Sequence, residues 1–81
     1  MSSVAALFIV YPREGATDDA EASVRALGAK VVEREEMGFG IMVLKALFTF
    51  DDSETSTSEI EDKIKRSDGV SEVEVREEGL V

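Results

Sequence analysis

The sequence contains no cysteine and no histidine among its 81 residues. Without cysteine, the chain forms no disulfide and offers no thiolate as a nucleophile or a zinc ligand. Without histidine, it lacks the usual general base at neutral pH and a common metal-binding side chain. Any covalent chemistry would have to rest on carboxylates, Ser, Thr, Lys or the single tyrosine, Tyr11. We therefore expect a protein that is not an enzyme and that needs no cofactor.

Long hydrophobic runs are also missing. The longest run near the start, Val4 to Tyr11, is far too short to cross a bilayer. No basic segment precedes it and no small-residue cleavage site follows it, as a signal peptide would require. We expect a cytoplasmic protein without a membrane partner, folded as a single domain over residues 1–81.

Positive charge is scarce, because 9 Lys and Arg face 18 Asp and Glu for a net charge of −9. Such a field repels phosphate backbones, so we expect no direct contact with nucleic acid. It would attract a basic protein partner, although solubility alone also accounts for it. Acidic pairs such as Glu33 and Glu35 lack the ligand order of a calcium-binding loop and are typical of a solvated strand face, so no metal site is expected.

Apolar periodicity and turn residues predict the order strand, helix, strand, strand, helix, strand. Continuous apolar runs indicate buried strands, whereas apolar residues four and seven apart indicate helices. The expected elements are a strand over Val4–Tyr11 buried on both faces, a helix over residues 18–27, an edge strand over Lys30–Glu36, a long strand over Ile41–Phe50, a helix from the cap Ser56 to the stop at Gly69, and a strand with Val70, Val73 and Val75. Arg76–Val81 is expected to be a short tail.

Two helix starts are predicted from capping residues. Asp18 with Glu21 is a plausible capping pair for the first helix, in competition with Thr17. Ser56 with Glu59 forms a Ser-x-x-Glu capping box for the second helix.

This order of elements predicts an α+β, ferredoxin-like split βαβ fold, with two helices on one face of a four-stranded antiparallel sheet. Right-handed crossovers place the first and third strands in the middle. These are the most apolar strands, and the charged second and fourth strands become the edges. The apolar residues on the sheet face without helices remain unexplained by the fold.

Phe39 lies between Gly38 and Gly40 at the turn into the third strand, and three interpretations are open. It packs in the core at a hairpin whose glycines form a bulge. Alternatively, it is an exposed aromatic that anchors an interface. Stacking on a nucleic-acid base is the third possibility, which the acidic charge disfavours.

The segment Met37–Ile41, followed by Leu44, Lys45 and Asp51-Asp52, resembles the corresponding segment of the translation elongation factor 1-beta family. Pro12-Arg13-Glu14 and Gly69–Val75 resemble the first and last strands of archaeal members. The resemblance covers nearly the whole chain, and the length suits the archaeal type, which consists only of the exchange domain.

The resemblance implies a guanine-nucleotide exchange factor that promotes release of GDP from elongation factor 1-alpha so that GTP can rebind. It also implies that Phe39 presses into a pocket of the GTP-binding domain of that partner, and that the free protein is monomeric. The residues implied in partner binding are Gly38, Phe39, Gly40, Ile41, Met42, Arg76, Leu80 and Val81.

Two departures from the family pattern remove positive charge. Leu80 stands where the family has a basic residue, and Met42 and Val43 stand where it often has lysine. Exchange would then depend on a steric effect of the apolar tail, on Arg76, or mainly on Phe39. The alternative function is a small ferredoxin-like regulatory or assembly module that homo-oligomerises through its open sheet face.

Overall fold

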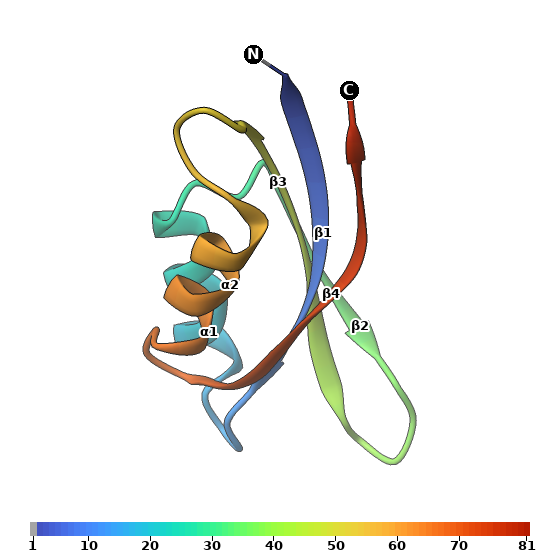
Figure 1. Cartoon of the computed structure of the whole chain (residues 1–81). Helices are drawn as coiled ribbons and strands as arrows, with labels where there is room; N and C mark the ends of the chain where they lie inside the picture. Colours follow the sequence, from blue (N-terminus) through green and yellow to red (C-terminus); the bar gives the residue numbers. More distant parts are fainter. Residues whose placement is uncertain (1) are drawn as a thin grey trace.

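The computed structural model describes residues 2–81 and has the predicted order of elements. The sheet order is β2-β3-β1-β4, every neighbouring pair is antiparallel, and both helices lie on one side of the sheet (Figure 1). This arrangement confirms the ferredoxin-like α+β fold. The elements are β1 (Ser3–Pro12), α1 (Thr17–Ala26), β2 (Val31–Glu36), β3 (Met42–Asp51), α2 (Thr57–Lys65) and β4 (Val70–Leu80).

The core lies between the helices and the two middle strands. Phe8 of β1 and Phe48 of β3 pack edge to face, with ring centroids 5.5 Å apart, the geometry that aromatic quadrupoles favour. Alternate residues of each middle strand face the helices. The buried core residues are Ala6, Phe8, Val10, Ala20, Val24, Leu44, Ala46, Phe48, Ile60, Ile64, Val70 and Val73.

On the face without helices, the part of the sheet nearer the β2–β3 hairpin is also buried. Ile9 and Val43 have no exposed surface, whereas Ala5 and Leu7 are half-buried. The prediction that the first strand is buried on both faces is therefore correct at Ile9, toward its C-terminal end, and wrong at Ala5 and Leu7, where no neighbouring side chain fully covers the open face.

The predicted cap of the first helix is wrong. Ala16 is the N-cap residue and makes no side-chain capping hydrogen bond. The carboxylates of Asp18 and Glu21 instead accept hydrogen bonds from the guanidinium group of Arg34 in β2, which are contacts between opposite charges. The second cap is confirmed for Ser56, whose hydroxyl accepts a hydrogen bond from the Glu59 amide at 3.2 Å. The Glu59 carboxylate accepts from the Thr55 hydroxyl at 3.3 Å, so the reciprocal half of the capping box is not formed.

The predicted tail at residues 76–81 is also wrong, because β4 continues to Leu80 and pairs with the start of β1. The register shifts between Leu7 and Phe8, so one extra residue of β4 is accommodated there. Such a bulge interrupts the alternation of apolar and polar residues. The strand signal is therefore lost after Val75, although the pairing continues.

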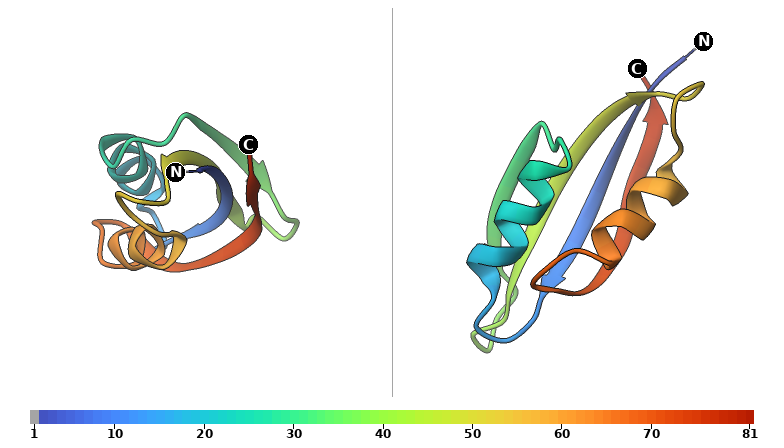
Figure 2. Two further views of the ribbon diagram at one scale, coloured as in Figure 1. Left: turned by 45° about the horizontal axis from the view of Figure 1, so that its top comes forward. Right: turned by 90° about the vertical axis from the view of Figure 1, so that its left-hand side faces the viewer.

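The molecule is elongated, with principal extents of 41 × 21 × 16 Å. The β2–β3 hairpin and the β1–α1 turn lie at one end, and the start of β1 and the C-terminus lie at the other (Figure 2). No helix within residues 2–81 is long and apolar enough to span a membrane.

We predict that Gly69→Ala destabilises the fold. Gly69 has φ +82°, and a Cβ there would lie 2.7 Å from the Ala20 amide nitrogen and 3.0 Å from the Ala16 carbonyl oxygen. The clash involves the first turn of α1, which cannot move without disturbing the core. We expect the free energy of unfolding in urea to fall by about 2 kcal/mol.

The matched control is Gly79→Ala, because, apart from its chain neighbours, no heavy atom of the described residues lies within 4 Å of the added Cβ. This variant should unfold within about 0.5 kcal/mol of the parent protein. Equal stability of the two variants would contradict the packing of Gly69 against α1.

Candidate protein-binding site

The β2–β3 hairpin turns through three consecutive residues in left-handed conformations: Gly38 (φ 96°), Phe39 (φ 55°) and Gly40 (φ 76°). The turn is closed by the Met37 amide, which donates to the Ile41 carbonyl at 2.8 Å, and by the Ile41 amide, which donates to the Gly38 carbonyl at 3.0 Å. Glycine adopts such angles readily, whereas phenylalanine at positive φ costs about 1 kcal/mol.

Phe39 is fully exposed, at 104% of its reference surface. The interpretation of Phe39 as a core residue is therefore wrong. Met37 and Ile41 on either side of the turn are also about half exposed. We call Met37–Ile41 the hairpin tip. Three exposed apolar side chains on so short a segment are typical of a surface that binds another protein, where aromatic residues supply much of the affinity.

The β2 strand that carries the tip is held against α1 by Arg34. The Arg34 Nε donates to Glu21 Oε1 at 2.7 Å, and the Arg34 Nη2 donates to Asp18 Oδ1 at 2.6 Å. Arg25 also binds Glu21, at 2.9 Å. Arg34, and to a smaller extent Arg25, lowers the pKa of Glu21 below its usual value, and the two carboxylates raise the pKa of Arg34. The tip thus projects from an anchored strand.

A cleft of about 310 Å³ lies beside the tip, between the hairpin and the β1–α1 turn. No local sequence pattern indicates that these two segments adjoin, because their proximity depends on the sheet order. Arg13 is fixed there, since its amide donates to the Gly69 carbonyl at 2.7 Å and its Nε to the Val70 carbonyl at 3.3 Å. The cleft is lined by Pro12, Arg13, Glu14, Gly15, Thr17, Gly40, Ile41 and Met42.

The residues predicted for partner binding do not form one patch. Gly38–Met42 lie together at the hairpin, but Leu80 pairs with Val4, which in turn pairs with Phe50. Phe50 is eight residues along β3 from Met42, a separation of roughly 26 Å at the usual rise of a strand. Leu80 and Val81 are therefore exposed at the opposite end of the molecule.

Arg76 lies between these two ends. Its neighbours Val75 and Glu77 pair with Phe8 and Leu7, so Arg76 occupies the bulge of β4. It is exposed at the middle of the strand rather than beside Phe39.

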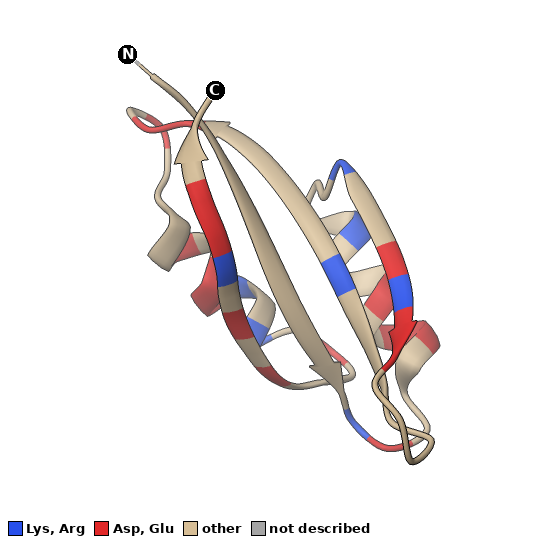
Figure 3. Ribbon diagram, turned by 90° about the vertical axis from the view of Figure 1, so that its right-hand side faces the viewer, with Lys and Arg blue, Asp and Glu red and all other residues tan. Residues whose placement is uncertain are grey.

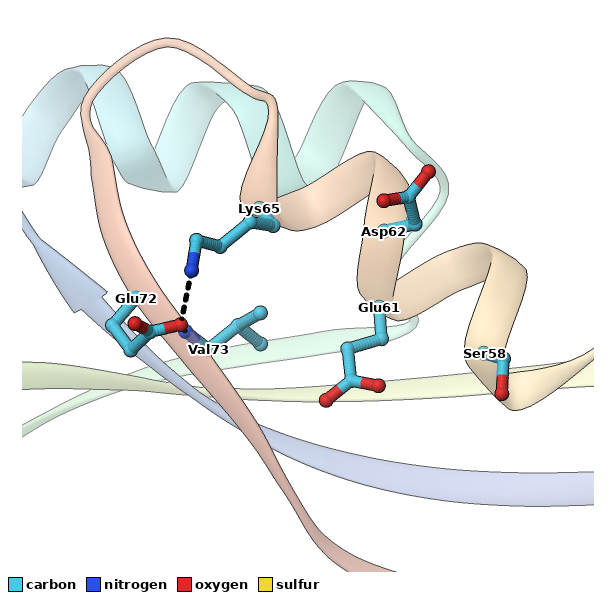
Figure 4. A pocket seen from close by; sticks show the side chains of 6 residues that line it. All are labelled: Ser58, Glu61, Asp62, Lys65, Glu72 and Val73. Carbon is cyan, nitrogen blue, oxygen red and sulfur yellow. Dashed lines mark hydrogen bonds and ion pairs between the residues drawn. The ribbon is translucent and has the colours of Figure 1, made fainter.

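Another hollow, of about 280 Å³, lies between α2 and β4 and is polar (Figure 4). Its ammonium group, Lys65 Nζ, is already paired with Glu72 Oε1 at 2.7 Å, and Lys65 lowers the pKa of Glu72. Among residues 2–81, no three acidic side chains converge as ligands for a metal ion. The charged groups in this hollow therefore serve to connect α2 to β4 through the Lys65–Glu72 ion pair. Its lining residues are Ser58, Glu61, Asp62, Lys65, Glu72 and Val73.

Comparison with known families gives one match. The family model described as the EF-1 guanine nucleotide exchange domain matches residues 6–79, from within β1 to within β4. No curated protein sequence matches the chain. The match includes both the hairpin tip and the bulged strand β4.

We predict that Arg34→Gln raises the pKa of Glu21 toward 4.5, its usual value, as followed by NMR titration. Because the folded-state pKa of Glu21 is lowered, the pair stabilises the fold above pH 4.5 and ceases to do so as the pH falls through the lowered pKa. The stability difference between the parent and the variant should be present at neutral pH and shrink in acid.

Arg66→Gln is the control, because Arg66, at the C-cap of α2, forms its one ion pair within residues 2–81 with the exposed Asp62. It should leave the Glu21 titration unchanged. An unaltered Glu21 pKa in Arg34→Gln would show that β2 is not held to α1 by these charges.

Proposed function

The chain belongs to the EF-1 guanine nucleotide exchange domain family, and from this premise we propose that it is an archaeal-type elongation factor 1-beta that releases GDP from elongation factor 1-alpha. Family membership gives the chain a nucleotide-exchange role in translation elongation and an elongation factor G protein as its partner. The identity of that G protein, the contact residues and the mechanism are our proposal, as are its place in the cytoplasm and its monomeric free state.

The observation that supports the proposal most strongly is the exposure of Phe39. A bulky apolar side chain is fully exposed, on a residue whose backbone angle carries a cost, at the tip of an anchored hairpin. Nothing within residues 2–81 covers Phe39 to offset that cost. Insertion of the ring into an apolar pocket of the GTP-binding domain would provide the offset, since buried aromatics are common binding hot spots.

The proposed mechanism is a shift of population. If the chain binds the nucleotide-free or distorted G protein more tightly than the GDP-bound form, then GDP binding is weakened by the same coupling free energy. No covalent bond forms or breaks, so no catalytic residue is required. A sequence without histidine or cysteine suits such a role.

The geometry favours Phe39 over the tail as the main contact in exchange. Leu80 and Val81 are roughly 26 Å from the hairpin along the sheet, and neither side chain carries the positive charge of the family's basic residue. In this proposal, the hairpin residues Gly38–Met42 act at one pocket. The tail, and Arg76 in the bulge, would reach the partner only through separate contacts.

The first test mixes the protein with elongation factor 1-alpha from the same source, loaded with fluorescent GDP. We expect the chain to accelerate GDP release in the presence of excess unlabelled nucleotide, with saturation as its concentration rises. Unchanged release at saturating protein, with both proteins folded, would disprove the proposed function.

We further predict that Phe39→Ala slows stimulated GDP release at least about tenfold, corresponding to roughly 1.4 kcal/mol or more. The exposed ring makes no internal contact that its loss would disturb, so thermal unfolding should change little. Leu27→Ala removes another partly exposed apolar side chain, at the C-terminal end of α1, and should exchange normally. Normal exchange by Phe39→Ala would exclude the ring as the wedge.

A further inference from the structure

Seen from the side without helices, the edge strands β2 and β4 carry most of the charged residues of the sheet, chiefly acidic ones, whereas the middle strands are almost free of charge (Figure 3). Two hollows lie on this face, of about 350 Å³ on the β2 side and about 260 Å³ on the β4 side. Both are lined by Leu7 and Leu47, so they are two parts of one depression, which we call the open groove. Its lining residues are Ala5, Leu7, Val31, Glu33, Lys45, Leu47, Glu77, Glu78 and Gly79.

The floor of the open groove is a row of apolar side chains across three strands. Val31 of β2 pairs with Leu47 of β3, and Leu47 pairs with Leu7 of β1. Leu7 and Leu47 are half-buried, and Val31 is 44% exposed. The fold alone does not require leucine at these positions, because they face away from the helices.

The two rims of the open groove are acidic. Glu33 lies on the β2 side and Glu77 on the β4 side, and neither has an ion-pair partner among residues 2–81. The lysine between them, Lys45, is paired with Glu35 at 3.1 Å. Beyond the groove, Glu74 accepts a hydrogen bond from the Tyr11 hydroxyl at 2.8 Å, which raises the pKa of Tyr11. Unneutralised carboxylates thus flank an apolar floor.

This charge pattern discriminates between possible occupants. A second copy of the chain would bring the same acidic rims and a net charge of −9, and like charges in an interface oppose association. A segment with apolar side chains in its middle and lysine or arginine on both sides would match both the floor and the rims. Complementary charge also accelerates encounter.

We propose that the open groove is a second contact surface for the same elongation factor G protein, and that it binds a segment of that partner with an apolar middle flanked by basic residues. The inference rests on the proposed function. Leu47 is five residues along β3 from Met42, roughly 17 Å from the hairpin. The groove therefore supplies affinity at a distance from the Phe39 pocket, whereas the hairpin supplies the exchange step.

The test measures GDP release as a function of exchange-factor concentration, at low and moderate salt. Two double variants alter the groove, Leu7→Thr with Leu47→Thr for the floor and Glu33→Gln with Glu77→Gln for the rims. Threonine retains a high strand propensity at these positions. We expect each double variant to raise the half-saturating concentration about tenfold with an unchanged maximal rate. The rim variant should also lose most of its salt dependence.

Glu54→Gln with Asp68→Asn is the matched control, because it removes the same charge from exposed loops outside the open face. This control should have the same half-saturating concentration and the same maximal rate as the parent protein. Phe39→Ala serves as the opposite control, since it should lower the maximal rate. Thermal unfolding checks each variant, and single Leu47→Thr replaces the floor variant if the latter fails to fold.

Three results separate the possibilities. If the groove variants have the same half-saturating concentration as the parent while Phe39→Ala is impaired, the groove is not a contact surface. The exchange function would remain supported. No stimulation by the parent protein would refute the exchange function itself. A dimer of the parent in sedimentation, dissociated by Leu7→Thr with Leu47→Thr, would assign the groove to a second copy and overturn our proposal.

Discussion

The pairing of β1 with β3 on one side and β4 on the other is the interaction on which the rest of the structure depends. Because β1 is hydrogen-bonded along both edges and its alternate residues Ala6, Phe8 and Val10 have no exposed surface, it has no room for charge. Apart from Lys45 and Asp51 of β3, the charged residues of the sheet are therefore on the edge strands β2 and β4, and the others lie on helix surfaces and in loops. The acidic rims of the open face and the anchoring of β2 both follow from that distribution.

Much of the fold could be predicted because its signals are local. Continuous apolar runs marked β1 and β3, and the Ser56 hydroxyl capped α2 as its spacing suggested. The predictions were wrong where the local structure depends on residues that are distant in the sequence. Asp18 is a residue type that commonly caps helices, but its carboxylate instead binds Arg34 of β2. The end of β4 lacks apolar alternation because a bulge changes its register against β1.

The candidate site illustrates the same limit. The two glycines around Phe39 suit either a buried bulge or an exposed turn, and only the position of the hairpin beyond the end of the sheet decides in favour of exposure. The resemblance to a family supplied the hairpin and the C-terminal residues as one set. The register of the sheet places them at opposite ends, and it also brings the β1–α1 turn beside the hairpin, a proximity that no local pattern encodes.

The hydrogen bond between Tyr11 and Glu74 has a consequence for optical measurements. The chain has one tyrosine and no tryptophan, so its near-ultraviolet absorption and emission are dominated by a single ring. That ring reports on the open face, because its hydroxyl donates to a glutamate on the β4 edge of that face. The protein thus contains an intrinsic spectroscopic probe on the one sheet surface that the helices leave uncovered.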